Sequence, residues 1–355
     1  MKSLRHQLVG NCFLHPAWDY LLIGGVWSIL LTLYWLFGRL AEPGSDPYLN
    51  PDQLVWLVLF ANSAHFAAST VRLYSKPTYL KEFSFLAFGF PVITIAVLSI
   101  CVMFPGVFGR YLQFIYLTWA PFHYAKQIYG LSLMYSFRGG SRLDLTDKRL
   151  IYWTCMMPFL YAVMSGSSHM GLGWLLPADL VTTNAMLRDA LSSVKLILTS
   201  LTFVMPALLY WRIWKTKRQT LPLIVLVMMV ANGLWWTGLS FLDAFVIATI
   251  AHGIQYMAIM LIYHVREQLA EPTNKHGWAF HAAGFYAKCV VLGYGLFNCW
   301  PFIFVWAGAG LAESMLMVIA TINLHHFIVD AYIWRLRVPE NQKALADRPA
   351  VAKTA

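Results

Sequence analysis

Histidines recur inside the long apolar stretches of this 355-residue chain, where ionisable side chains are rare. Four of these stretches hold His65, His123, His252, and the adjacent pair His325 and His326. Imidazole is the commonest metal ligand in proteins, and iron, copper and zinc all accept it. The sequence therefore predicts a metal centre built from His65, His123, His252 and His326, with His325 as the alternative to its neighbour.

Polar side chains stand one helical turn from these histidines. Residues three or four apart share a helix face, and a ligating histidine usually donates its second N–H to a carboxylate or an amide. The residues at this spacing are Asn62, Ser69, Gln127, Gln255, Asn323 and Asp330. We expect the amides to support the imidazoles, and Asp330 to be either a ligand or a group that orients His326. An ion pair between Asp330 and Arg335 is the alternative.

The histidines also lie at similar depths along their predicted membrane helices. Counted from the outer ends of their predicted helices they lie about 9–16 residues in, or ~14–24 Å at 1.5 Å per residue. Any one of them could simply hydrogen-bond a carbonyl or hydroxyl of a neighbouring helix. Four in one layer favour a function, because polar groups at mid-membrane depth are costly. Tyr124, Tyr256 and Gln255 are candidate donors lining a pocket there.

The elements that position these residues are membrane helices. Hydrophobic residues make up 59% of the chain, charged residues only 12%, and the mean hydropathy is +0.58. A soluble core cannot bury that excess, and runs of about 20 apolar residues are long enough to cross a bilayer. The predicted spans are 18–39, 53–73, 83–104, 111–136, 150–168, 190–212, 221–241, 243–264, 284–306 and 310–334. We expect an all-α polytopic bundle of about ten transmembrane helices in one domain, residues 1–338, followed by a disordered cytoplasmic tail, 339–355.

The basic residues set the predicted topology. Of the 26 Lys and Arg, three (Arg39, Arg110 and Arg188) fall in loops predicted outside, two (Lys126 and Lys195) lie within spans away from their inner ends, and the other 21 lie inside or at the inner ends of spans. This bias follows the positive-inside rule with both termini cytoplasmic. It also requires a break near Asp243, because one helix over 221–264 would put the C-terminal basic cluster outside. The net charge of +10 thus indicates topology and lipid anchoring, and no nucleic acid partner is expected.

Known signatures are missing from the chain. The HxxxH and HxxHH clusters of membrane desaturases, HExxH, a Walker loop and GxSxG are all absent. The five cysteines are dispersed without CxxC and are interpreted as packing residues. Histidines dispersed over several predicted helices lie in NSAHFAAS, PFHYAKQ, AHGIQY and NLHHFIVD. In this respect the chain is similar to Brp/Blh-type carotene-cleaving oxygenases, whose iron ligands are also dispersed. That family's closely spaced histidine pair is absent, and no substrate is carried over.

These observations predict an intramembrane metalloenzyme, a non-haem iron oxidoreductase or oxygenase that acts on a lipophilic substrate. Iron is the expected cofactor, with copper or zinc as alternatives. Expected partners are membrane lipid, the lipophilic small molecule, and an electron donor or a membrane complex; in a bacterium the location would be the cytoplasmic membrane. Three other functions fit the same residues: a haem-binding electron-transfer or cofactor-assembly protein, a proton-coupled or metal transporter, and a structural subunit of a membrane complex.

Overall fold

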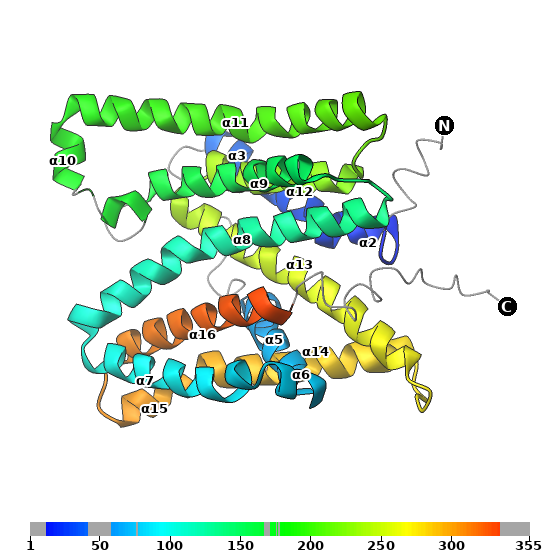
Figure 1. The fold of residues 1–355 in the computed structure, drawn as a ribbon. Coiled ribbons are helices and arrows are strands. Elements are labelled where there is room, and N and C mark those ends of the chain that lie inside the picture. The colour runs from blue at the N-terminus through cyan, green and yellow to red at the C-terminus, as the bar shows by residue number, and fades with distance from the viewer. Residues whose placement is uncertain are drawn as a thin grey trace. The chain divides into compact units, whose positions relative to one another are not determined.

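The computed structural model describes residues 12–41, 58–75, 77–166, 171–174, 176 and 178–333 (Figure 1). Every regular element in these ranges is a helix, which confirms the predicted all-α class for this part of the chain. The predicted tail over 339–355 lies outside the described residues.

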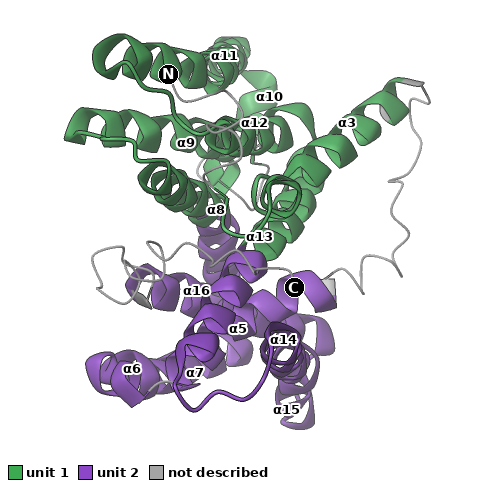
Figure 2. Cartoon of the chain, turned by 90° about the vertical axis from the view of Figure 1, so that its right-hand side faces the viewer, with its two compact units in different colours: residues 1–49, 121–255, 345–355 green, residues 50–120, 256–344 purple. Residues whose placement is uncertain are grey.

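The chain folds into two compact units that alternate along the sequence (Figure 2). Unit 1 comprises residues 1–49, 121–255 and 345–355, and unit 2 comprises residues 50–120 and 256–344. Two long helices, α8 (Arg110–Arg138) and α13 (Phe241–Ala270), each contribute residues to both units without a break. A single domain over residues 1–338 stays a prediction.

Unit 1 is built on α9, which packs against α11 and α12, while α12 also packs against α3. Its further elements are α2 (Pro16–Trp18), π-helical η1 (Asp19–Ile23), α3 (Val26–Ala41), α9 (Leu145–Ser165), 3₁₀-helical η5 (Gly171–Trp174), α10 (Ala178–Thr183), α11 (Ala185–Lys217) and α12 (Leu223–Gly238). The chain bends by 50° between η1 and α3, where Gly25 has a φ of +78° that favours glycine.

Unit 2 is built on α5, which packs against α14 and α16, while α16 also packs against α7 and α15. Its further elements are η2 (Val58–Ser63), α5 (Ala64–Ser75), α6 (Pro77–Glu82), η3 (Phe85–Gly89), α7 (Phe90–Met103), η4 (Pro105–Gly109), α14 (Trp278–Tyr294), η6 (Gly295–Cys299), α15 (Trp300–Trp306) and α16 (Leu311–Ile333). The four η elements of this unit are π-helical turns, and each runs directly into an α-helix.

Among the described residues, five helical segments are long and apolar enough to cross a membrane, which indicates a membrane protein. They are Phe85–Met103, Ala185–Lys217, Phe241–Ala270, Trp278–Trp306 and Leu311–Tyr332. The bent pair η1 and α3 would add a sixth, and α12 is apolar but shorter. Helices lie in all ten predicted ranges as far as these are described.

The predicted break near Asp243 is present. Helix α12 ends at Gly238 and α13 begins at Phe241. The Ser240 hydroxyl oxygen accepts the backbone N–H of Asp243 over 3.3 Å, which caps the first turn of α13. A local capping signal therefore separates two apolar runs that hydropathy alone would join.

A polar cluster joins α9 to the end of α11 within unit 1. Asp144 caps α9 by accepting the Asp147 backbone N–H over 2.8 Å, and the Lys217 ammonium lies 3.0 Å from its carboxylate. Lys217 also contacts the buried Asp147, which lies 3.5 Å from Arg212. The Asp147 N–H and then Lys217 lower the pKa of Asp144.

Candidate metal centre

Unit 2 brings together two predicted ligands, His65 from α5 and His326 from α16. Their ring centroids lie 4.9 Å apart at an interplanar angle of 86°, and both side chains are buried. Two imidazoles bound to one ion at 90–110° would have centroids about 4.5–5.2 Å apart, given metal–nitrogen bonds of about 2.0–2.1 Å. The pair therefore has the spacing of two ligands of a single ion.

Each ring nitrogen of His326 lies beside a polar group. The Ser69 hydroxyl oxygen lies 2.9 Å from His326 Nδ1 and 3.2 Å from the Phe66 carbonyl oxygen. Nε2 lies 3.3 Å from Oδ2 of Asp330. A shared proton or a metal cation between an imidazole nitrogen and a carboxylate stabilises this arrangement.

Asp330 is oriented by a second hydrogen bond within unit 2. Tyr256 donates its hydroxyl to Oδ1 of Asp330 over 2.7 Å, which leaves Oδ2 beside His326. An ion about 2.1 Å from both Oδ2 and Nε2 would make an angle of about 105° with them, within the usual range for a metal site. The centroid of the Tyr256 ring also lies 5.6 Å from that of His65 and 5.4 Å from that of His326.

Helix α14 supports the segment that carries His65. A Cβ at Gly293 would lie 2.6 Å from the backbone oxygen of Ser63, closer than real contacts allow. The absence of a side chain at Gly293 thus lets α14 approach the junction of η2 and α5, two residues before His65.

Unit 1 holds the second pair, His123 from α8 and His252 from α13. Their ring centroids lie 4.8 Å apart at 73°, and His252 is buried. Tyr124 packs its ring 4.7 Å from that of His252, and its hydroxyl lies 2.7 Å from the Thr249 hydroxyl. This pair also has the spacing of two ligands of one ion, and within unit 1 the Tyr124 ring and the Thr249 hydroxyl lie beside it.

The two predicted glutamines connect backbone segments within unit 1. Gln127 donates to the His252 carbonyl over 3.2 Å and to the Gln255 side chain over 3.3 Å. Gln255 donates to the Ile23 carbonyl over 2.8 Å. These amides tie α8, α13 and η1 together and thereby support the backbone around the histidines.

The other predicted residues take separate positions in unit 2. His325 stacks on Phe90 of α7, with ring centroids 4.9 Å apart at 15°, so it faces a different helix from His326. Asn323 donates to the Ile319 carbonyl of its own helix over 2.7 Å. Asn62 lies in η2, and its buried Oδ1 has no hydrogen-bond partner within the described ranges. The proposed partner of Asp330, Arg335, falls beyond the described residues.

Two contacts of the site could not be read from spacing. Ser69 was expected beside His65 on the same helix, and it bonds His326, 257 residues away. Tyr256 reaches Asp330 across 74 residues. Only their residue types, a hydroxyl and a phenol within apolar runs, hinted at a role.

Comparison of the chain with known protein families, with curated proteins and with solved structures found no match.

Proposed function

We propose that this protein is an intramembrane, histidine-ligated metalloenzyme, a non-haem iron oxidoreductase that acts on a lipophilic substrate. The observation that carries the proposal is the position of His326 Nε2, which lies 3.3 Å from the Asp330 carboxylate and beside the ring of His65. Two imidazoles and one carboxylate are the donor set of many non-haem iron oxygenases, and iron bound by them would supply oxygen activation.

Each residue has a role in this proposal. His65, His326 and Asp330 are the ligands; Ser69 orients the ring of His326 through Nδ1, and Tyr256 holds the carboxylate. His123 and His252 remain predicted ligands.

The geometry of the pairs disfavours haem between the two members of a pair. Axial imidazoles lie on opposite faces of a macrocycle, whereas the rings of each pair contact each other directly at 4.8 or 4.9 Å. Iron without a macrocycle, or copper or zinc, suits this spacing better.

The proposed membrane arrangement is ten spans with both termini cytoplasmic. The charge bias and the helices in all ten ranges support it. Green fluorescent protein fused after Ser141, predicted inside, should fluoresce, and the same fusion after Asn184, predicted outside, should not. The reverse pattern would overturn the topology.

Oxygen uptake tests the activity directly. Iron-loaded protein in lipid, given a reductant and a lipid extract, should consume oxygen faster than His326→Ala and Asp330→Asn. His276→Ala, which changes an exposed histidine between α13 and α14, is the matched control and should keep the rate. Equal rates in all four proteins would overturn an iron oxidoreductase centred on His326.

A further inference from the structure

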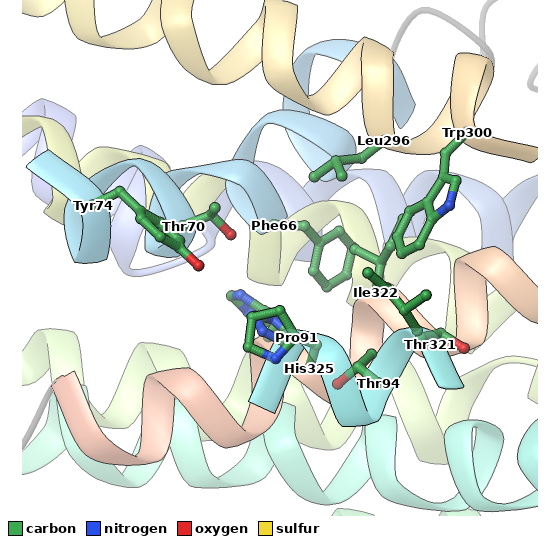
Figure 3. A pocket seen from close by; sticks show the side chains of 12 residues that line it. Phe66, Thr70, Tyr74, Pro91, Thr94, Leu296, Trp300, Thr321, Ile322 and His325 are labelled. Carbon is green, nitrogen blue, oxygen red and sulfur yellow. The ribbon is translucent and has the colours of Figure 1, made fainter. Parts of the chain in front are cut away.

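A cavity of about 160 Å³ lies within unit 2 and includes both His325 and His326 in its wall (Figure 3). Phe66 of α5, Ile322 of α16 and Trp300 of α15 converge on it. The lining is nearly all apolar. An apolar space of this kind suits hydrocarbon and disfavours water.

The volume limits what can enter. An engineered apolar cavity of about 150 Å³ binds benzene. The cavity beside His326 therefore accepts one ring or a short branched end of a molecule. The remainder of a larger substrate must lie outside it.

The mouth of the cavity faces the surface that would contact lipid. Tyr74 and Ile95, both of which line the cavity, are 41% and 49% exposed. Ile95 belongs to α7, a candidate membrane span with mostly outward-facing side chains. A ligand can therefore enter sideways from the bilayer, and its chain can stay in lipid.

A buried hydroxyl belongs to the wall of the cavity. Thr321 is 3% exposed, and its hydroxyl has no hydrogen-bond partner among the residues that the structure describes. By contrast, Thr94 of α7, which also lines the cavity, donates to the Phe90 carbonyl over 2.8 Å. A buried hydroxyl without a partner is unfavourable, so Thr321 is the natural partner for one oxygen of a ligand.

We infer that this cavity binds the end of a lipophilic molecule, no larger than a six-membered ring or a short branched chain, that carries a single hydroxyl or carbonyl oxygen. Thr321 pairs with that oxygen, and His326 lies in the same wall. The inference deepens the proposed function, since it names the substrate class for the centre at His326, but ligand binding itself needs no metal.

Photolabelling of the full-length protein in detergent tests this inference, with a diazirine-bearing decanol and the matched diazirine-bearing decane as probes. The alcohol should label residues 90–103 or 311–333 more strongly than the alkane does. Thr94→Phe, which adds a ring to the wall, should abolish this labelling. Ser99→Phe, on the same helix but away from the cavity, should keep it.

Thr321→Val removes the hydroxyl while keeping the shape, and it should lower labelling by the alcohol about fivefold, as expected for one hydrogen bond. Labelling by the alkane should not change. Equal labelling by both probes in the wild type, or labelling that survives Thr94→Phe in folded protein, would overturn the inference. Selective labelling of a wild-type protein that binds no metal would instead overturn the metal centre and leave the cavity assignment in place.

Discussion

The two histidine pairs have the same spacing and different surroundings. In unit 2, His326 has Ser69 on one nitrogen and Asp330 on the other, and Tyr256 holds the carboxylate. In unit 1, the pair packs against the Tyr124 ring, and glutamine amides support the backbone. Within the two units, the pairs therefore differ in the carboxylate of Asp330, which lies beside the pair in unit 2.

The largest effect is expected from removing the anionic donor. Asp330→Asn keeps the shape of the side chain but loses its charge, and we expect metal affinity to fall by about a hundredfold or more, beyond the usual cost of changing a supporting residue. Titration of the metal-free protein with Fe²⁺ under anaerobic conditions measures this. Asp243→Asn, at the start of α13, should bind metal as the wild type does. Unchanged affinity in Asp330→Asn would remove the distinction between the two pairs.

A smaller effect is expected from releasing the ring of His326. Ser69→Ala removes the hydrogen-bond partner of Nδ1, and metal affinity should fall about 10–100-fold, as is typical of groups that orient a ligand. The same titration measures it, with Ser99→Ala as the control. If Ser69→Ala binds metal normally, the hydrogen bond does not prepare Nε2 for binding.

The approach of α14 to α5 gives a prediction about stability. Gly293→Ala places a methyl group against the Ser63 backbone and should destabilise the protein by about 1–3 kcal/mol, as overpacking does. Thermal unfolding in detergent measures this. Gly284→Ala on the same helix has open space around it and should be neutral or stabilising by up to about 1 kcal/mol. Equal melting temperatures for the two variants would show that the close approach does not matter.

The smallest effect concerns pH and unit 1. The pKa of Asp144 is lowered in the folded protein, so its stabilising contribution is present above the unfolded pKa of about 3.9 and is lost as pH falls through the folded value. The melting temperature should therefore fall on acidification below about pH 4, and less so in Asp144→Asn. A wild type and variant with parallel pH profiles would contradict this role.

Charge pattern and residue spacing predicted a helix break and a contact within one helix. The break before Asp243 followed from the charge pattern, and Asp330 lies beside His326 because residues four apart share a helix face. The contacts of Ser69 with His326 and of Tyr256 with Asp330 depend on how helices pack, which no spacing encodes. The direction of His325 likewise followed only from its stacking on Phe90 of α7.

Elemental analysis of detergent-purified protein tests the metal centre most directly. Wild type, His65→Ala, His326→Ala and His276→Ala would be expressed with ample metal and checked for folding. We predict near-stoichiometric iron in the wild type and in His276→Ala, and its loss in folded His65→Ala and His326→Ala. A folded wild type without bound metal, or His326→Ala that retains it, would contradict a metal centre in unit 2.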